Sequence, residues 1–496
     1  MRAVASPARY RGARIALAVA AVGLVASQAG AAGAPAAAGV GSHPAVQRPA
    51  AARSGTSLAT DWPAYLVGPA HHSYIPGQTA ITPATAPDLA RRWGDRFAQQ
   101  VLASPTIAGG AVYVGAGTGW FFKLDEKTGK TLHKIYIGRQ PERTCESARG
   151  VVSTATVAND PARRELTVYV AGPDGYLYAL RASNLSVVWR SVVAIPSAKI
   201  NNYFNWGSPT VAHGTIYMGV SSNCDKPLVR AGVISYSQRT GKKLAEFYTV
   251  PRGQVGGSVW SSVGVAANGD VYAATGNGPA QRPRLAYSES ILKLSSRTLR
   301  LLGRFQVPRA QVTGDGDFGS SPLLFGNFVG ACDKNGIYYA LHQSTMKVAW
   351  ERRVGVPSGK GGGSCLATPA YNGRDLFVGG NGTTLDVGGV QTTYPGSVQE
   401  LNPDTGDVIW ATGLAGEDIG SPALDGGQIL AVPIFGSEAG DGVDLVTTVS
   451  SGSVAAGTVV RKLVSGSDFG QPVFAGNMIF AAAQNGIAAF AVQATG

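Results

Sequence analysis

The chain has 496 residues, a formal net charge of +12, 67 glycines, 28 prolines and 15% charged residues. This composition is typical of an all-β protein with many turns and argues against a helical fold. Removing the four arginines of residues 1–29 from the 42 basic residues leaves a net charge of +8. That charge indicates a solvated basic surface or an anionic partner, and we recognise no nucleic-acid-binding module.

The first sixty residues predict export. Four arginines precede an apolar run from Ile15 to Ala26, and Ser27-Gln28-Ala29 offers a small-residue cleavage site. We therefore interpret residues 1–29 as a signal peptide, which predicts a secreted or extracytoplasmic protein with no transmembrane segment after cleavage. Residues 30–60 are rich in Ala, Gly and Pro and contain no acidic residue, so we expect a disordered linker.

We predict one domain over residues 61–496, in which one phrase recurs eight times from about residue 89 onward with a period of about 50 residues. The phrase opens on a Ser-Pro-like dipeptide. It continues with short runs of branched and aromatic residues bounded by glycine, such as Leu376 to Gly379, which are typical of strands. The openers are Ser104-Pro105, Ser153-Thr154, Ser208-Pro209, Ser262-Val263, Ser321-Pro322, Thr368-Pro369, Ser421-Pro422 and Gln471-Pro472. The repeat predicts eight blades.

A hairpin turn follows these strands, and an aromatic residue often comes after the turn. Gly129, Gly241 and Gly406 occupy turns that favour a positive φ. The aromatics that follow such turns should lie on the outer strand and pack on the next blade; they are Trp189, Phe247, Phe305, Trp350 and Trp410. Each repeat therefore predicts a four-stranded antiparallel blade, and the chain an all-β, eight-bladed β-propeller.

The last repeat, from Gln471 to Val492, has room for only three strands. The segment Leu89–Trp93 precedes the first opener and has its own tryptophan, as an outer strand does. We predict that this segment completes the last blade. A composite blade leaves no free sheet edge.

The four cysteines predict two disulfides. In a four-stranded blade, the loop before the inner strand and the loop after the second strand emerge on the same face. Cys145 and Cys365 lie in the first kind of loop, and Cys224 and Cys332 in the second. Blade order then pairs Cys145 with Cys224 and Cys332 with Cys365, as suits an exported protein. A metal site is the weaker alternative, because there is no C-x-x-C spacing and histidine is scarce.

Unusual polar residues gather on the same face of two adjacent blades. Trp260 opens the fourth blade and Asn277 follows its second strand, while Asp315, Asp317 and Lys334 belong to the fifth. These side chains should meet at one end of the central channel. The alternative is a purely structural role, in which Asp and Asn beside Gly are turn residues and Trp260 plugs the channel.

These residues resemble the pyrroloquinoline-quinone (PQQ) alcohol dehydrogenases, especially the polyvinyl-alcohol-dehydrogenase-like branch. The resemblance lies in Ser-Val-Trp260, Ala-Thr-Gly-Asn277, Asp317-Phe-Gly and Asp-Lys334-Asn-Gly, and extends over most of residues 61–496. It implies that Trp260 stacks on the quinone, Asn277 and Asp317 contact calcium, Asp317 takes the alcohol proton and Lys334 binds the quinone oxygens. Cys-Glu-Ser-Ala-Arg149-Gly more loosely resembles the segment whose arginine meets the cofactor's carboxylates.

Three features depart from that family's pattern. No two cysteines are adjacent, so there is no disulfide plate on the second side of the quinone. The third blade has Asp225 where the family has a glutamate calcium ligand, so the shorter Asp225 would have to replace it. The sequence contains no C-x-x-C-H haem motif, so electrons would have to leave through a separate acceptor.

Two functions remain open. The first is a PQQ- and calcium-dependent oxidoreductase acting on an alcohol, including a polymeric one. The second is a noncatalytic propeller of the same superfamily, an extracellular scaffold or ligand-binding module with a protein partner. The set Trp260, Asn277, Asp317 and Lys334 favours the first; the absent glutamate and cysteine plate favour the second.

Overall fold

The computed structural model describes residues 61–77, 79–97, 101–141, 149–279, 285–357, 364–437, 440–464, 469–483 and 485–493. The predicted signal peptide and linker lie outside these ranges, so both stay predictions. In the described ranges, no helix is long and apolar enough to cross a membrane.

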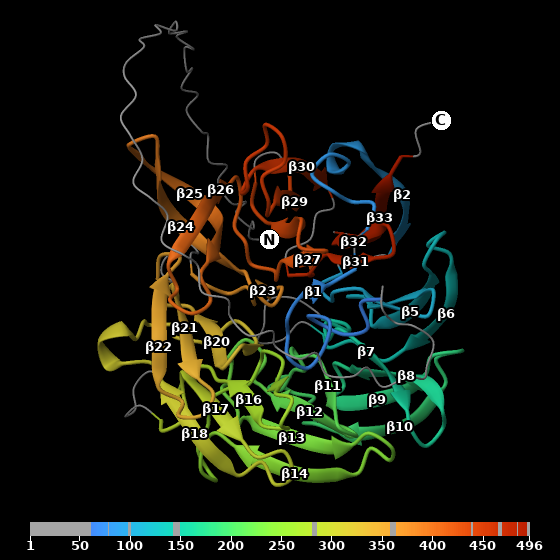
Figure 1. Ribbon diagram of the computed structural model, residues 1–496. Helices are drawn as coiled ribbons and strands as arrows, with labels where there is room; N and C mark the ends of the chain where they lie inside the picture. Colours follow the sequence, from blue (N-terminus) through green and yellow to red (C-terminus); the bar gives the residue numbers. More distant parts are fainter. Residues whose placement is uncertain are drawn as a thin grey trace, which may run out of the picture. The chain divides into compact units, whose positions relative to one another are not determined.

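The described residues form eight β-sheets arranged radially around a central axis (Figure 1). Each sheet contains an antiparallel meander of four strands, which confirms the predicted eight-bladed propeller. The first four blades follow the chain without interruption. Blade 1 contains β3 (Thr106–Ala108), β4 (Ala111–Gly115), β5 (Trp120–Asp125) and β6 (Thr131–Tyr136); blade 2 contains β7 (Thr156–Asp160), β8 (Glu165–Ala171), β9 (Tyr176–Arg181) and β10 (Val187–Val192); blade 3 contains β11 (Thr210–Ala212), β12 (Thr215–Val220), β13 (Gly232–Ser237) and β14 (Lys243–Tyr248); blade 4 contains β15 (Gly264–Val265), β16 (Val271–Ala274), β17 (Ser290–Leu294) and β18 (Leu301–Gln306).

The next blades follow the same plan, with two short 3-10 helices, η1 (Ala86–Asp88) and η2 (Arg309–Gln311), outside the sheets. Blade 5 contains β19 (Leu323–Phe325), β20 (Phe328–Asp333), β21 (Ile337–His342) and β22 (Val348–Arg353); blade 6 contains β23 (Ala370–Tyr371), β24 (Leu376–Val387), β25 (Val390–Leu401) and β26 (Val408–Leu414); blade 7 contains β27 (Ala423–Asp425), β28 (Ile429–Ile434), β29 (Gly442–Thr447) and β30 (Val459–Val464), with β1 (Tyr74–Ile75) parallel to β27. The sequence predicted a strand only from Leu376 to Gly379. The structure extends it into a hairpin that projects from the ring (Figure 1).

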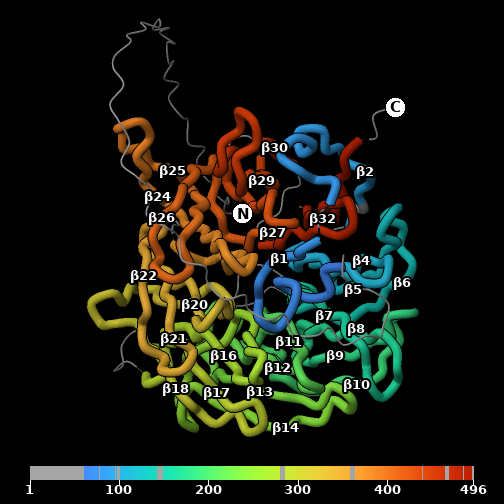
Figure 2. Tube along the Cα trace, in the orientation of Figure 1, coloured from blue at the N-terminus to red at the C-terminus, as the bar shows by residue number. Residues whose placement is uncertain are grey.

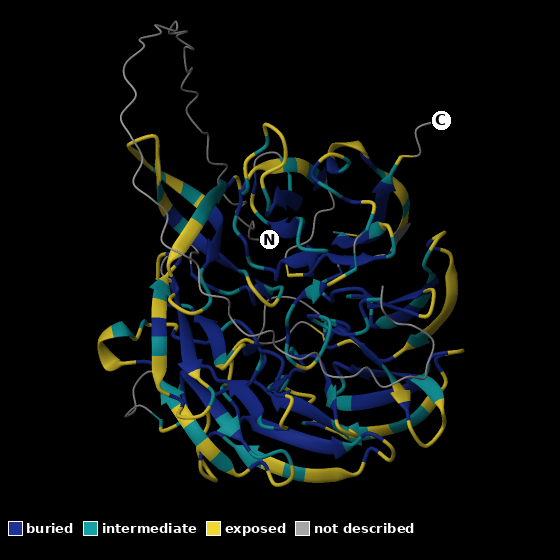
Figure 3. Cartoon of the chain, viewed as in Figure 1, coloured by how far each residue is buried: buried dark blue, intermediate teal, exposed yellow. Residues whose placement is uncertain are grey.

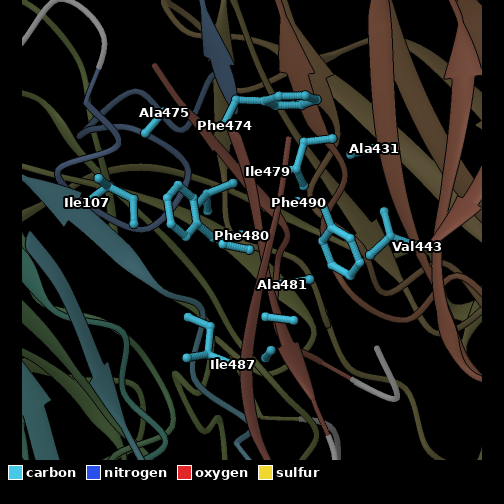
Figure 4. Packing of buried hydrophobic residues seen from close by; sticks show 14 of the residues in the cluster. Ile107, Ala431, Val443, Phe474, Ala475, Ile479, Phe480, Ala481, Ile487 and Phe490 are labelled. Carbon is cyan, nitrogen blue, oxygen red and sulfur yellow. The ribbon is translucent and has the colours of Figure 1, made fainter. Parts of the chain in front are cut away.

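Blade 8 is composite, as predicted. Strands β31 (Val473–Ala475), β32 (Met478–Ala483) and β33 (Gly486–Val492) come from the end of the described chain, and β2 (Leu89–Arg96) supplies the outer strand. Strand β2 is antiparallel to β33, with Leu89 opposite Val492. The largest apolar cluster spans blades 7, 8 and 1 at this closure, with Ile107 beside Phe480 (Figure 4).

The repeated opener residues form a hydrogen-bonded ring around the axis, which we call the opener ring. At seven junctions among the described residues, the backbone N–H of one member donates to the side-chain oxygen of the next over 2.9–3.0 Å. The members are Ser104, Thr154, Ser208, Ser262, Ser321, Thr368, Ser421 and Gln471. In the second blade the member is Thr154 rather than the predicted Ser153, whose hydroxyl accepts from the N–H of Ala171 instead. This ring explains why a short hydroxyl side chain recurs in the repeat.

An N-terminal segment, residues 61–75, runs through the middle of the ring, and we call it the axial segment (Figure 2). Its carbonyl oxygens accept hydrogen bonds from inner-strand N–H groups of six blades, numbers 1, 2, 4, 5, 6 and 7. At the remaining ring junction, the longer Gln471 side chain accepts from the N–H of Leu66 and donates to the carbonyl of Pro422. The inner edges of these six sheets thereby have a backbone partner.

The apolar core lies in layers between neighbouring blades. Separate clusters join blades 1–2, 2–3, 3–4, 4–5, 5–6 and 6–7, in addition to the one at the closure. Inner strands are therefore buried, whereas the outer strands β6, β14 and β22 carry exposed residues (Figure 3).

Outer-strand aromatics pack on the next blade, as predicted. Trp93 lies over Gly129, which has φ of 71°, and a Cβ on that glycine would lie 2.4 Å from the indole. Trp350 packs on Gly406 in the same way and donates its Nε1–H to the carbonyl of Pro403 over 2.9 Å. Glycine therefore serves two needs at these turns, the positive φ and the close approach of the indole.

Candidate functional site

A pocket of about 550 Å³ lies against the opener ring, and all eight blades contribute to its wall. The residue two positions before each ring member lines it, and we call this set the collar. The collar consists of Leu102, Val152, Trp206, Trp260, Gly319, Leu366, Ile419 and Phe469. Tyr65 of the axial segment also lines the pocket, and its hydroxyl pairs with Ser421 Oγ over 3.0 Å.

An ion pair stands at the charged side of the pocket. Lys334, which follows β20, places its Nζ 2.8 Å from Asp317 Oδ2 and 3.0 Å from Asp315 Oδ2. The same ammonium lies 5.6 Å from the centroid of the Trp260 ring. Trp260, Asp315, Asp317 and Lys334 all line this pocket, whereas Asn277 contacts Asp317 from outside the lining. The turn-residue alternative does not account for a tryptophan, a lysine and two carboxylates meeting there.

Burial and charge have opposite effects on the pKa values of the two partners in this ion pair. Asp317 is 4% exposed, and its burial raises the pKa of its carboxyl, which the Lys334 ammonium offsets only in part. Burial alone would lower the pKa of Lys334, but attraction to Asp317 and Asp315 raises it above its ordinary value. A carboxylate whose pKa is raised toward neutrality is a better general base than an ordinary surface aspartate.

Two further residues with oxygen atoms suited to a hard cation interact with Asp317. The N–H of Asn277 donates to Asp317 Oδ1 over 2.7 Å, and Asn277 Oδ1 is buried without a hydrogen-bond partner in the described part of the chain. Asp225 lines the same pocket, and its charge contributes to the raised pKa of Asp317. Calcium prefers carboxylate and amide oxygens. Asn277, Asp317 and Asp225 thus carry oxygens of the types that calcium prefers, and the calcium site itself stays a prediction. Among the described residues, no group of three His, Cys, Asp or Glu residues suited to a metal occurs.

Arg149 lies elsewhere on the pocket wall, over a second tryptophan. Its guanidinium carbon is 4.7 Å from the centroid of the Trp206 ring. Burial lowers the pKa of Arg149 from its ordinary value. The predicted arginine is thus in the pocket, with its planar cation against an indole.

A buried acid lies directly behind the charged side. Asp333, the residue before Lys334, is 1% exposed, and burial raises its pKa to about 8. Its Oδ1 accepts from the N–H of Asn335, and its Oδ2 has no partner among the described residues.

One predicted disulfide is confirmed. Cys332 and Cys365 are bonded, with Cα atoms 5.0 Å apart, and link blade 5 to blade 6. The bond holds the strand end that carries Lys334 beside the segment that carries Leu366. Cys224 lines the pocket, but Cys145 lies outside the described residues, so the other pairing stays a prediction.

Sequence reasoning missed Trp206 and Tyr65. Trp206 precedes Ser208 by two residues, as Trp260 precedes Ser262, so comparing the repeats position by position would have found it. Tyr65 precedes the first repeat, and the sequence there carries no periodic signal.

Comparisons with known proteins agree with this architecture. A family model described as outer membrane protein assembly factor BamB matches residues 146–350. Among solved structures, the quinohemoprotein alcohol dehydrogenase from Comamonas testosteroni superposes with a TM-score of 0.67 at 15% identity, over 89% of this chain and 82% of that one. This likeness shows that the chain shares the propeller fold of that enzyme.

Two further solved structures are similar to this chain. A europium-containing methanol dehydrogenase gives a TM-score of 0.67 at 14% identity, over 86% of this chain and 90% of that one. BamB from Moraxella catarrhalis gives 0.53 at 12% identity, over 82% of this chain and 99% of that one. A search of curated proteins found no significant match. At these identities the structural likeness establishes the fold, and function has to be argued from the pocket.

Proposed function

We propose that this protein is a secreted quinoprotein-like dehydrogenase that oxidises an alcohol, polymeric alcohols included, with PQQ and calcium. The observation that carries the proposal is the cluster of Trp260, Asp317 and Lys334 in one pocket beside the unpartnered oxygen of Asn277. The likeness to alcohol and methanol dehydrogenase structures supports it.

The chain's own residues supply binding, orientation and proton transfer. When bound, the quinone would act as hydride acceptor and calcium as Lewis acid. Trp260 offers an indole face for a planar ring, and Lys334 places an ammonium where oxyanion charge develops. Asp317 accepts the hydroxyl proton while the alcohol carbon loses hydride and becomes a carbonyl carbon. Because the sequence has no C-x-x-C-H motif, the electrons leave through a separate acceptor.

A scaffold function is the second candidate. The match of residues 146–350 to the BamB family model favours it, as do the missing adjacent cysteines and the shorter Asp225. A scaffold would bind a protein partner and would need no quinone.

Cofactor reconstitution separates the two candidates. Purified apoprotein should bind PQQ in the presence of calcium, seen as a change in quinone absorbance, and should then oxidise alcohols with a dye as acceptor. Trp260→Ala should weaken quinone binding, whereas Trp120→Ala, which removes an indole outside the pocket lining, should not. If calorimetry detects no quinone binding and primary, secondary and polymeric alcohols give no turnover, the scaffold function replaces the proposal.

A further inference from the structure

The pocket wall is divided into a charged arc and an apolar arc. The charged lining residues all lie between residues 149 and 334, in blades 2 to 5. The collar residues of the five contiguous blades 6, 7, 8, 1 and 2 are aliphatic or aromatic: Leu366, Ile419, Phe469, Leu102 and Val152. Four of the five are half-buried, and Phe469 is 51% exposed.

The polar groups beneath the apolar arc are already engaged with one another. Ser421 Oγ accepts from the N–H of Thr368 and pairs with the Tyr65 hydroxyl. Ser104 Oγ accepts from the N–H of Gln471. A hydroxyl-rich ligand placed on this arc would exchange its hydrogen bonds with water for contacts with hydrocarbon, which is unfavourable.

The apolar arc begins next to the proposed base. Gly319 follows Asp317 by two residues. Leu366 packs so closely on Gly319 that a Cβ on this glycine would lie 2.4 Å from Leu366 Cδ2. Hydrocarbon therefore adjoins the segment that carries Asp317. A volume of about 550 Å³ falls well within the range of about 300–1,000 Å³ typical of small-molecule sites.

We infer that the apolar arc binds the hydrocarbon part of the substrate, so that the site takes alcohols bearing an alkyl or aryl group of several carbons rather than methanol or small polyols such as glycerol. This inference rests on the proposed function. Asp317 receives the hydroxyl end, and Leu366, Ile419 and Phe469 cover the carbon chain. Selectivity then follows from burial of methylene groups.

A homologous series tests this assignment. With the reconstituted enzyme, kcat/KM should rise about fourfold per added methylene from ethanol through butan-1-ol to hexan-1-ol, the factor expected for a buried methylene. Ile419→Ser should flatten this rise, whereas Ile409→Ser, which changes an exposed isoleucine of the same size on β26, should leave it as in the wild type. Equal slopes in the two variants, or a flat series in the wild type, would overturn the assignment.

Binding to the apoprotein keeps the test independent of catalysis. Saturation-transfer NMR should show hexan-1-ol binding more tightly than ethanol or glycerol, and Ile419→Ser should remove the difference. If the wild type prefers hexan-1-ol in this way while no quinone binds, the apolar arc binds hydrocarbon as inferred and the dehydrogenase proposal fails. If quinone-dependent turnover is found but glycerol binds as well as hexan-1-ol, the dehydrogenase proposal stands and the apolar arc does not select the substrate.

Discussion

Asn277 donates its backbone N–H to Asp317 Oδ1 over 2.7 Å while its own side-chain oxygen stays buried and unpartnered in the described part of the chain. The two residues come from neighbouring blades. Asn277 lies after the end of β16, and Asp317 lies in the loop before β19. A buried acceptor without a donor costs about 1–3 kcal/mol. A bound cation would remove that cost, since an amide oxygen is a suitable ligand for calcium.

Replacing Asn277 should therefore weaken calcium binding. We expect Asn277→Ala to raise the calcium dissociation constant by roughly ten- to hundredfold, the loss seen when even an outer partner of a metal ligand is removed. Isothermal titration of calcium into the protein measures this directly. Asn268→Ala, which alters an exposed turn residue, is the control. Equal affinities in the two variants would show that Asn277 is not a ligand.

The second prediction concerns the proposed base. Asp317→Asn keeps an oxygen for the N–H of Asn277 but cannot take a proton, so kcat should fall by about 10²–10⁴-fold with little change in quinone affinity. Asp315→Asn is a matched control, because Asp315 contacts the same Lys334 but its side chain is 57% exposed. Stopped-flow and steady-state kinetics separate kcat from binding. Similar losses in both variants would indicate that the charge around Lys334, and not proton transfer, matters.

The blade count, the composite closure, one disulfide and the charged side of the pocket could be predicted because they depend on the repeat. A phrase that recurs eight times fixes where each loop emerges, so Trp260, Asp317 and Lys334 could be placed on one face before any contact was known. Residues outside the repeat could not be placed in this way. The axial segment pairs with six inner strands through backbone carbonyls, and backbone pairing leaves little trace in side-chain identity.

The hairpin β24–β25 shows the same limit. The sequence predicted the part of β24 that is buried within blade 6, where apolar residues mark it. Beyond Asn381 the hairpin is mostly exposed, with Val387 and Val390 at its tip, and an exposed strand lacks the buried, apolar pattern that a sequence-based prediction relies on.

The third prediction concerns the disulfides. Peptide mapping without reduction should recover Cys332 linked to Cys365, and Cys145 linked to Cys224. Breaking the Cys332–Cys365 bond should lower the free energy of unfolding by about 2–4 kcal/mol, because the unfolded chain loses a cross-link across a separation of 33 residues. Chemical denaturation of Cys365→Ser measures this loss. Alkylation of all four thiols in the native protein would contradict both pairings.

The last prediction concerns Asp418, a carboxyl group at a position that three other blades fill with valine. Asp418 lies three residues before Ser421 of the opener ring, and the matching residues Val101, Val151 and Val259 are fully buried. Asp418 is 1% exposed, and neither of its oxygens has a hydrogen-bond partner among the described residues. Burial raises its pKa well above the ordinary value.

The sign of the pH dependence follows from this shift. An unfolded aspartate has a pKa of about 3.9, so above that pH the unfolded chain releases a proton that the folded chain keeps. The free energy of unfolding should therefore fall as the pH rises above about 4, as far as the raised pKa of the folded state. Asp418→Val should remove this contribution and stabilise the protein at pH 7 by about 1–3 kcal/mol, the cost of an unpartnered buried polar group. Urea unfolding at several pH values tests this, with Glu417→Gln as the control that removes a neighbouring, less buried carboxyl. A destabilised Asp418→Val variant, or one with the wild-type pH dependence, would mean that Asp418 has a partner that the fold requires.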